Sequence, residues 1–423
     1  MGGASRRFLM AVWDGGGNVP PELGVARRLV TRGHHVHVLG DPTLAAAAEA
    51  ARCTFTAWER APHRSSLAPS DDVIKDWETE NPLVLLRRAR DRLIAGPADR
   101  FAADTAEAVN AFAPDVVVSD AFLFGAVIAA QAASLPVALL VPNIWVMPVR
   151  GTPPIGPGFP PAKTVLGRAR DAAVGRVADR LFSAGLPAVN AARAGRGLAP
   201  LRSFYHQALS AQRILVLSSP AFDYAADSVP PNVTYVGPIL DEPDWTEPWS
   251  DPWSPTDERP LVLVAFSSTY QAQGPLLRRV VEALSTLPVR ALVTVGPMLD
   301  PGEVEPAGNV AVVPSAPHGA VLAGAALAVS HCGHGTTMKA LAAGVPMVCI
   351  PMGRDQNDTA ARVVHHGAGV RLPPAASATR VRAAVLEVLH HDAFRTGAGA
   401  LAARIAEDVH AGGAERELEA LAG

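Results

Sequence analysis

Two short stretches decide the fold of this chain, HCGHGTT at residues 331–337 and PMGRDQ at residues 351–356. The apolar run at residues 325–330 comes directly before the first stretch and predicts a buried parallel strand. Residues 336–343 have a helical pattern, and the apolar run at residues 345–350 predicts a second strand. A strand, a glycine turn, a helix and a strand in this order form one βαβ unit of a parallel sheet.

The turn between this strand and this helix is typical of an anion-binding site. Gly333 and Gly335 allow the backbone to approach a ligand closely. The helix N-terminus offers unpaired N–H groups and about half a positive charge. Thr336 and Thr337 add hydroxyl donors, and His331 lies at the end of the strand, facing the same crevice. We therefore expect a diphosphate on this turn.

A carboxylate and an amide follow the next strand. Asp355 and Gln356 lie at its carboxyl end, where ligands of open α/β sheets bind. Two such side chains next to each other suit a ring that carries vicinal hydroxyl groups. The sequence therefore predicts a sugar beyond the diphosphate.

Three sub-motifs in this half of the chain resemble the donor-binding signature of family 1 glycosyltransferases. They are His-x-Gly-x-Gly-Thr, Ala-Gly-Val-Pro and Pro-x-x-x-Asp-Gln, and all stand at the spacing of that family. The members of this family are inverting, metal-independent enzymes that use nucleotide sugars. The resemblance implies an α/β protein of the GT-B fold, with two Rossmann-like, doubly wound parallel-sheet domains facing a central cleft.

The resemblance also implies which residues bind the donor. In the first and third sub-motifs they are His331, Gly333, His334, Gly335, Thr336, Thr337, Asp355 and Gln356. Family enzymes carry a Gly/Ser turn after the first strand of this domain, which here corresponds to Ser267, Ser268 and Thr269. A Ser/Thr cluster after a strand is equally often a helix cap, so both interpretations stay open. Pro314 and His318 lie where family members approach the nucleobase.

Length and composition restrict the class of protein. A chain of 423 residues exceeds what one core usually serves, so two domains are expected. The formal charge of −3 and the absence of a basic stripe speak against nucleic acid as a partner. Three scattered cysteines without metal-ligand spacing suggest reduced thiols. The apolar region at 121–149 is interrupted by polar residues and proline, so we expect no membrane span and a cytoplasmic protein.

The order of predicted elements gives the domain boundaries. Strand, helix and strand patterns begin at residue 8, so residues 1–240 are expected to form an N-terminal acceptor-binding domain. Residues 241–260 are rich in acidic residues, proline and tryptophan, which indicates a linker. Residues 261–404 then form the nucleotide-sugar domain, and residues 405–423 a helix that crosses back to the first domain, as the resemblance implies.

The proton acceptor is where this chain departs from the family. Many members have Gly-His-Val-x-Pro after the first strand, with the histidine as general base, but here the sequence has Asn18 at that position. An amide cannot take a proton at neutral pH. Asp120 and Asp14 each end a predicted strand on the side of the same cleft, although such residues are also common in turns. We favour Asp120 as the base and expect Asn18 to orient the acceptor.

The predicted reaction moves a hexose or deoxyhexose from a UDP- or dTDP-sugar to a hydroxyl group of an apolar natural product. A phenol, an enol or an aromatic carbon would need little help from a base and is a further option. Because the chain contains no Asp-x-Asp, no metal and no other cofactor is expected. The acceptor is expected to contact irregular segments through Trp58, Trp77, Trp145 and Phe159.

Two other functions remain open on the sequence alone. A nucleotide-sugar epimerase of the same fold would need no bulky acceptor pocket. A catalytically silent homologue that assists another enzyme would explain the missing histidine, but it would not need the intact Asp355-Gln356 pair. The abundance of alanine and of arginine pairs, together with Asn18 in place of histidine, resembles bacterial antibiotic-pathway enzymes. The sequence leaves the oligomeric state open between a monomer and a homodimer.

Overall fold

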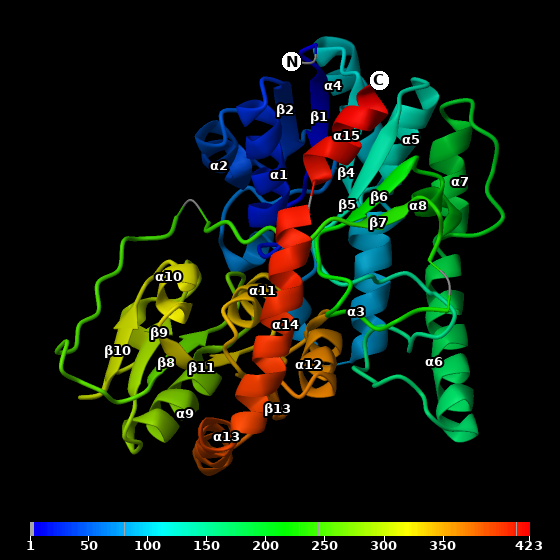
Figure 1. Cartoon of the computed structure of the whole chain (residues 1–423). Helices are drawn as coiled ribbons and strands as arrows, with labels where there is room; N and C mark the ends of the chain where they lie inside the picture. The colour runs from blue at the N-terminus through cyan, green and yellow to red at the C-terminus, as the bar shows by residue number, and fades with distance from the viewer. Residues whose placement is uncertain (1–3, 80, 228, 244, 412) are drawn as a thin grey trace.

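The computed structural model describes residues 4–79, 81–227, 229–243, 245–411 and 413–423. These residues form two β-sheets with seven and six strands, and every strand pairing is parallel. Figure 1 shows the first sheet in the upper half of the molecule and the second in the lower half. The prediction of two doubly wound parallel-sheet domains is therefore confirmed.

The first sheet has the strand order β3-β2-β1-β4-β5-β6-β7. The strands span Arg7–Ala11 (β1), His35–Gly40 (β2), Thr54–Ala57 (β3), Val116–Asp120 (β4), Val137–Val141 (β5), Arg213–Val216 (β6) and Val233–Tyr235 (β7). The chain winds away from β1 in one direction through β2 and in the other through β4. A ligand is expected beside the carboxyl ends of these two central strands, because the strand order reverses there.

Helices cover both faces of this sheet, and its central strands β1, β4 and β5 are almost entirely buried and mostly apolar. The helices are Val19–Thr31 (α1), Ala45–Ala50 (α2), Pro82–Ala89 (α3), Ala98–Phe112 (α4), Phe124–Ala132 (α5), Val165–Ser183 (α6), Leu186–Ala194 (α7) and His206–Leu209 (α8). Leu9 and Val117 pack with α4 and α5 on one face, whereas Phe8 and Val116 pack with α1 on the other.

The second sheet has the strand order β10-β9-β8-β11-β12-β13. Its strands span Leu261–Ala265 (β8), Arg290–Thr294 (β9), Val310–Val313 (β10), Ala325–Ser330 (β11), Met347–Cys349 (β12) and Gly369–Arg371 (β13). Its helices are Gly274–Ser285 (α9), His318–Leu322 (α10), His334–Ala342 (α11), Gln356–His365 (α12) and Ala378–His390 (α13). The strand order reverses between β8 and β11, so the segments that follow these two strands flank the second expected ligand position.

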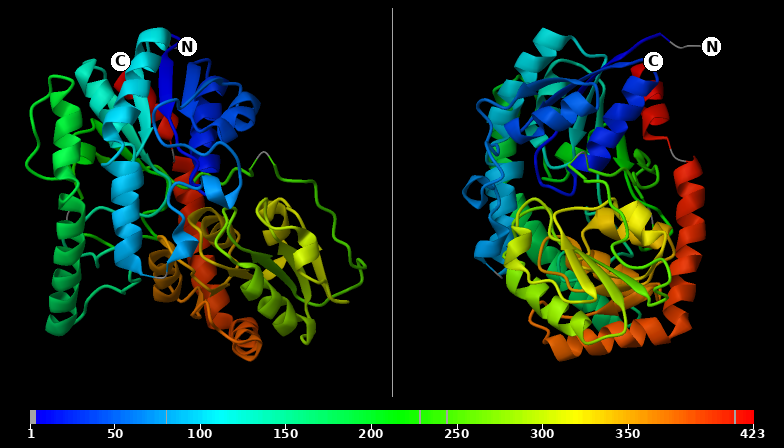
Figure 2. Two further views of the ribbon diagram at one scale, coloured as in Figure 1. Left: turned by 180° about the vertical axis from the view of Figure 1, so that it is seen from behind. Right: turned by 90° about the vertical axis from the view of Figure 1, so that its left-hand side faces the viewer.

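The last part of the chain returns to the first sheet. Helix α14 (Asp392–Ala411) runs along the side of the molecule, and α15 (Ala414–Ala422) packs on α1, β4 and β6. Figure 2 shows this course in both views. The helix expected at residues 405–423 is instead the end of α14 followed by α15, with residue 412 outside the described residues. The exact limits of the linker remain a prediction.

One further expectation needs correction, the helical pattern that the sequence shows at residues 87–112. The helical pattern at 87–112 is not one helix, because Gly96 and Pro97 separate α4 from α3 and from the π-helical turn Arg90–Ile94. Between Ala57, which ends β3, and Pro82, which begins α3, the described residues are irregular as the sequence predicts, apart from the 3-10 turns Pro69–Asp71 and Asp76–Glu78. None of the helices in the described ranges is long and apolar enough to cross a membrane.

The two domains are joined by a buried ion pair. Arg362 of α12 lies 2.7 Å from Asp223, which follows β6, and both side chains are almost fully buried. Asp358, one turn earlier on α12, accepts hydrogen bonds from the backbone N–H groups of Gly156 and Gly158 at 2.7 and 3.0 Å. Because these contacts join the Pro-rich loop of the first domain to the second, they fix how the two sheets face each other.

A pair of glycine substitutions tests the packing of the first domain. A Cβ atom at Gly125 of α5 would lie 2.3 Å from the carbonyl oxygen of Ala98, so Gly125→Ala should lower the free energy of unfolding by about 1–3 kcal/mol. Gly175 of α6 has no atom within 4 Å of such a Cβ, so Gly175→Ala should raise stability by up to about 1 kcal/mol. Denaturant unfolding of both variants measures the two effects. Equal effects would contradict the close approach of α4 and α5.

Candidate functional site

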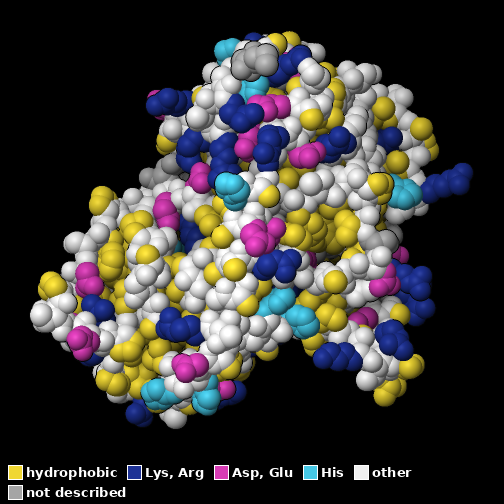
Figure 3. All heavy atoms as spheres, in the orientation of Figure 1, with side chains coloured by type: hydrophobic (Ala, Val, Ile, Leu, Met, Phe, Trp, Pro, Cys, Tyr) yellow, Lys and Arg dark blue, Asp and Glu magenta, His cyan; other side chains and the backbone are white. Residues whose placement is uncertain are grey.

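A single large cavity lies between the carboxyl ends of the two sheets. Its volume is about 2130 Å³, and its walls include Asp14 and Asp120, which follow or end β1 and β4. From the other domain they include Ser268 and His331, which follow β8 and β11. The cavity therefore joins the two positions at which the strand orders reverse. Figure 3 shows hydrophobic side chains gathered where the surface is hollowed between the body of the molecule and the projecting α6.

The predicted diphosphate turn lies on the wall of this cavity. Helix α11 begins at His334, with Gly333 as its N-cap residue, and Gly333, Gly335 and Thr336 all line the cavity. A Cβ atom at position 333 would lie only 2.6 Å from the Nε2 atom of His331. A glycine is therefore needed there for the imidazole to fold against the turn, while the free N–H groups of α11 point to the anion position.

His331 is uncharged at neutral pH. Its side chain is buried and stacks on Phe266 with ring centroids 6.1 Å apart. Burial is the main cause that lowers the pKa of His331 to about 4, and the positive charge of Arg354 acts in the same direction. His331 can thus offer a neutral N–H group to a phosphate, while the charge complementarity comes from the end of α11.

Two residues that the sequence predicts to bind the donor, Thr337 and Pro314, do not line the cavity. Thr337 is fully buried and its hydroxyl donates to the carbonyl oxygen of Gly333, as in an ordinary helical turn, so it does not face the cavity. Pro314 is not among the lining residues, and its carbonyl accepts from Gly296. His318 lines the cavity and contacts the Thr294 hydroxyl at 3.1 Å.

The Ser267–Thr269 turn is not a helix cap, because α9 begins at Gly274 with Gln273 as its N-cap residue, and all three residues of the turn line the cavity. Ser267 and Thr269 bond to each other through their hydroxyl groups at 3.0 Å, and Ser267 accepts from the N–H group of Thr269, so these two side chains stabilise the turn itself. Ser268 stands between them on the cavity wall with its hydroxyl group available. Of the three, Ser268 is the one placed to contact a phosphate.

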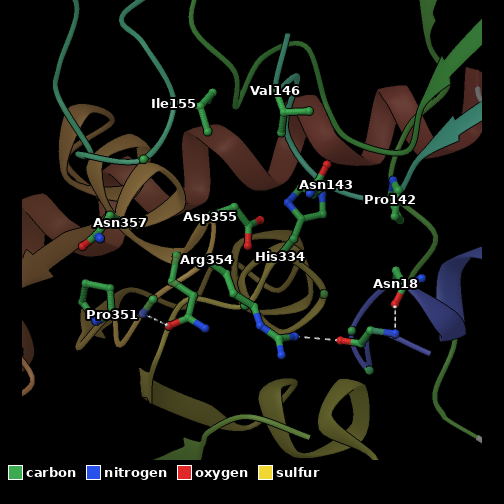
Figure 4. A pocket seen from close by; sticks show the side chains of 18 of the residues that line it. Asn18, Pro142, Asn143, Val146, Ile155, His334, Pro351, Arg354, Asp355 and Asn357 are labelled. Carbon is green, nitrogen blue, oxygen red and sulfur yellow. Dashed lines mark hydrogen bonds between the residues drawn. The ribbon is translucent and has the colours of Figure 1, made fainter. Parts of the chain in front are cut away.

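The side chains of Asp355 and Gln356 differ in how far hydrogen bonds within the protein already occupy them. The amide oxygen of Gln356 accepts from the N–H groups of Met352 and Gly353 at 2.7 and 3.0 Å, and its nitrogen donates to Gln271. Its polar atoms therefore shape the loop. Asp355 faces the cavity with its carboxylate, as Figure 4 shows, and burial raises the pKa of this group. The sugar hydroxyl groups can thus reach Asp355 more directly than Gln356.

Arg354 connects the donor loop to the first domain. Its Nε atom lies 2.6 Å from Asp76, and its Nη1 atom donates to the carbonyl oxygen of Gly15 at 2.9 Å, which is the bond drawn in Figure 4. Asp76 also accepts from Gln271 at 2.8 Å. The positive charge of Arg354 lowers the pKa of Asp76, which burial alone would raise. The sequence reading overlooked both residues of this pair.

Asn18 lies between two buried carboxyl groups. Its amide nitrogen donates to the carbonyl oxygen of Trp13 at 2.9 Å and lies 3.3 Å from Glu22 and 3.4 Å from Asp120. Its oxygen accepts from Gly15 at 3.0 Å. Both polar atoms of Asn18 are therefore bonded inside the protein, but Asn18 also lines the cavity, and its role in orienting the acceptor stays a prediction.

Asp120 is the carboxylate of the first domain that suits a base. It lines the cavity at the end of β4, and its Oδ1 atom accepts from the N–H group of Phe122 at 2.7 Å. Asp14 also lines the cavity, but its oxygens accept from Gly16 at 3.1 Å and from Thr43 at 2.7 Å and lie 3.5 Å from Arg64. These contacts give Asp14 a structural role in the turn, which the sequence reading kept as an alternative.

Two of the four predicted acceptor residues reach the cavity. Trp77 and Trp145 line it, Trp77 standing edge-on to Tyr270 at 5.2 Å. Trp58 is only 2% exposed, donates to the carbonyl oxygen of Val12 and packs on Phe101 in the core, so its prediction was wrong. Phe159 is not a lining residue either, since Arg170 covers its ring at 3.9 Å.

The cavity also contains residues that the sequence did not single out. Arg64, Asp76, Asn143 and Arg354 all line it, and Glu22 lies just behind Asp120. Glu22 could have been found, because it stands four residues after Asn18 on the first helix and so shares its face. The donor-motif residue His334 faces the cavity with one edge, and its Nε2 atom lies 3.3 Å from the carbonyl oxygen of Leu217.

Comparison with known proteins agrees with this geometry. Residues 279–421 match the family model described as erythromycin biosynthesis protein CIII-like, C-terminal domain. The chain is 31% identical over 403 residues to 4'-demethylrebeccamycin synthase of Lentzea aerocolonigenes, a match that covers 93% of this chain and 94% of that protein.

Solved structures with the same fold are also glycosyltransferases. The glycosyltransferase of kitacinnamycin superposes with a TM-score of 0.75 at 24% identity, over 99% of both chains. The glycosyltransferase VinC, solved in complex with dTDP, superposes with a TM-score of 0.65 at 19% identity, over 98% of this chain and 99% of that one. At these identities the likeness shows the fold, which is GT-B.

Removal of the Arg354 partner tests the contact between the domains. Asp76→Asn removes the nearer of two carboxylates beside the guanidinium, since Asp72 lies 3.9 Å from it, so the free energy of unfolding should fall by about 1–2 kcal/mol, less than for a fully buried pair because a quarter of the Arg354 side chain is exposed. Asp71→Asn, on the same loop but exposed, serves as the matched control. Denaturant titration of both variants gives the comparison, and equal stability of the two would contradict the role of this ion pair.

The lowered pKa of His331 predicts a pH dependence of stability. The unfolded chain binds a proton at this side chain below its ordinary value of 6.5, whereas the folded chain does so only near 4. Stability from His331 is therefore complete above pH 6.5 and is lost as the pH falls toward 4. Relative to His331→Gln, the wild type should lose up to about 3 kcal/mol across this range. A constant difference would show that folding does not lower the pKa of His331.

Proposed function

Since the chain belongs to the GT-B glycosyltransferases of bacterial natural-product biosynthesis, we propose that it is an inverting, metal-independent enzyme whose base is Asp120. It moves a hexose or deoxyhexose from a UDP- or dTDP-sugar to a hydroxyl group of an apolar natural product. The observation that carries this proposal is the single cavity with the end of α11 on one wall and the carboxylate of Asp120 on the other.

The size of the cavity supports two substrates at once. A volume of about 2130 Å³ is roughly twice that of a large small-molecule site. The donor occupies the half formed by the second domain, where the free N–H groups lie. The remaining half is lined by apolar side chains of α3, α5 and α6, together with Trp77 and Trp145. This half suits a large apolar acceptor and has no role in a simple epimerase.

Charge stabilisation on the leaving group comes from groups that the chain itself supplies. The diphosphate lies on the N-terminus of α11, where N–H groups, the Ser268 hydroxyl and the neutral His331 side chain donate to it. The negative charge that develops on the diphosphate is met by the positive end of the helix. Asp355 binds the hydroxyl groups of the sugar and keeps its reactive carbon toward the acceptor. No step in this scheme requires a metal ion.

Asp120 acts on the acceptor from the opposite wall. Its Oδ2 atom takes the proton of the acceptor hydroxyl group as the oxygen attacks the sugar carbon. The attack comes from the side opposite the diphosphate and therefore inverts the configuration at that carbon. The Asn18 amide and the N–H group of Phe122 hold the Asp120 carboxylate in place. An acidic acceptor such as a phenol would depend less on this base than an alcohol does.

Calorimetric titration tests the donor half of the proposal. UDP and dTDP are titrated into the protein with and without Mg²⁺, and micromolar binding of at least one of them, unaffected by Mg²⁺, is expected. Ser268→Ala, which removes one hydroxyl donor, should weaken binding by roughly tenfold, since a hydrogen bond to a charged group contributes about 1.5 kcal/mol. Absence of binding for both nucleotides would refute the proposal and favour an auxiliary protein.

Substitution of Asp120 tests the acceptor half. Asp120→Asn keeps the shape of the side chain but removes the base, so turnover of an alcohol acceptor should fall by about 10²–10⁴-fold while nucleotide binding is unchanged. Asp14→Asn is the matched control on the same cavity wall, and its effect should be much smaller. Unchanged turnover in Asp120→Asn would exclude Asp120 as the base.

A further inference from the structure

The carboxyl group of Glu22 lies behind Asp120, on the side away from the cavity. Glu22 is fully buried on α1, whereas Asp120 ends β4 on the cavity wall. One amide nitrogen, that of Asn18, lies 3.3 Å from Oε2 of Glu22 and 3.4 Å from Oδ2 of Asp120. The Oε1 atom of Glu22 has no hydrogen-bond donor among the described residues. A buried carboxylate oxygen without a donor is costly, so this group needs an explanation.

Protonation explains the unpartnered oxygen. Two carboxylates that touch in a buried place cannot both keep their charge, and one proton between them turns one member into a hydrogen-bond donor. Burial raises the pKa of Glu22 well above its ordinary value, and the charge and hydrogen bond of Asp120 raise it further. Burial also raises the pKa of Asp120, but its contacts with Glu22, Phe122 and Asn18 favour the charged form.

Geometry places the proton on Glu22, because the Phe122 N–H group donates to Asp120 at 2.7 Å, whereas the Oε1 atom of Glu22 has no donor among the described residues. The groups that act on its carboxyl are Asp120 of β4 and the amide of Asn18. The groups that act on Asp120 are Glu22, the Trp13 and Asn18 side chains and the N–H group of Phe122. None of these neighbours carries a positive charge, so within this set of described residues no cation keeps both members ionised.

We propose that Glu22 is a protonated carboxylic acid that donates a hydrogen bond to Asp120 and so keeps the cavity-facing carboxylate ionised and oriented as a base. In this arrangement Glu22 is a positioning residue, because it contacts Asp120 and not the substrates. The arrangement rests on the proposed function, in which Asp120 is the base. A pair of carboxyl groups bridged by Asn18 here replaces a base that uses an imidazole.

The proton balance of the transfer is complete with these groups. The acceptor O–H bond breaks and its proton goes to Asp120, while the acceptor oxygen forms a bond to the sugar carbon. The bond between that carbon and the diphosphate oxygen breaks, and its electron pair leaves with the diphosphate. Both carboxyl groups are then neutral, and Asp120 returns its proton to the solvent through the cavity.

Infrared spectroscopy tests the protonation state without any substrate. The difference spectrum between wild type and Glu22→Gln at neutral pH should contain the C=O stretch of one neutral carboxyl group. A difference spectrum is needed because burial also raises the pKa of Asp41 to about 7 and that of Asp358 to about 6. A spectrum that loses a carboxylate band in place of the neutral band would overturn the proposal.

The titration of Asp120 gives a second readout that a merely structural role of Glu22 would not change. Carboxyl-¹³C-labelled aspartate in the full-length protein, assigned with Asp120→Asn, reports the pKa of Asp120 by NMR. In Glu22→Leu, which removes the donor, this pKa should rise by about one unit or more. In Glu22→Gln, whose amide can still donate, it should stay within about one unit of wild type.

The possible results separate the two proposals. A marked fall of the Asp120 pKa in Glu22→Gln would mean that a negative charge had been removed, so that Glu22 is ionised in the wild type and the proposal is wrong. An unchanged pKa in Glu22→Leu would also overturn it. Both readouts are independent of turnover, so they can fail while Asp120→Asn still abolishes transfer. Conversely, full activity of Asp120→Asn would refute the base assignment and not the protonation of Glu22.

Discussion

Two arginines of the second domain form ion pairs with carboxylates of the first, and the relative position of the domains depends on them. Arg362 meets Asp223 at 2.7 Å and Arg354 meets Asp76 at 2.6 Å, and all four residues line the cavity. Neither pair is a strong source of stability, because removing charges from water costs about as much as their attraction returns. Their effect is on geometry, since a buried charge without its partner would be very unfavourable in any other domain arrangement.

This geometry divides the chemistry between the domains. The second domain supplies the positive end of α11, and the first supplies the carboxyl groups around Asn18. Arg354 lies at the boundary, with one contact to Gly15 in the loop that also bonds to Asn18. The loop that shapes the donor site and the loop that shapes the base are therefore coupled through a single guanidinium. A substitution of Asp76 is therefore expected to affect both the donor site and the loop around the base.

The donor half could be predicted from the sequence because its interactions are local. His331, Gly333 and the start of α11 are neighbours along the chain, and a glycine turn before a helix exposes N–H groups wherever it occurs. The acceptor half of the site was harder to predict from the sequence. Trp58 and Phe159 lie in segments without regular structure, where the sequence does not show whether an aromatic ring points inward. Trp58 packs on Phe101 and is buried, while Trp145 in a similar setting faces the cavity.

The sequence by itself determined the two parallel sheets, the diphosphate turn and Asp120 at a strand end, because these follow from the periodicity of apolar residues and from the direction of parallel strands. Only the tertiary structure decided what each polar side chain contacts. It assigned Asn18 to the carboxyl groups, Asp14 to its own turn and Gln356 to the donor loop. It also brought Glu22 against Asp120. Contacts between residues about a hundred positions apart depend on how helices pack on a sheet, and no local pattern encodes that packing.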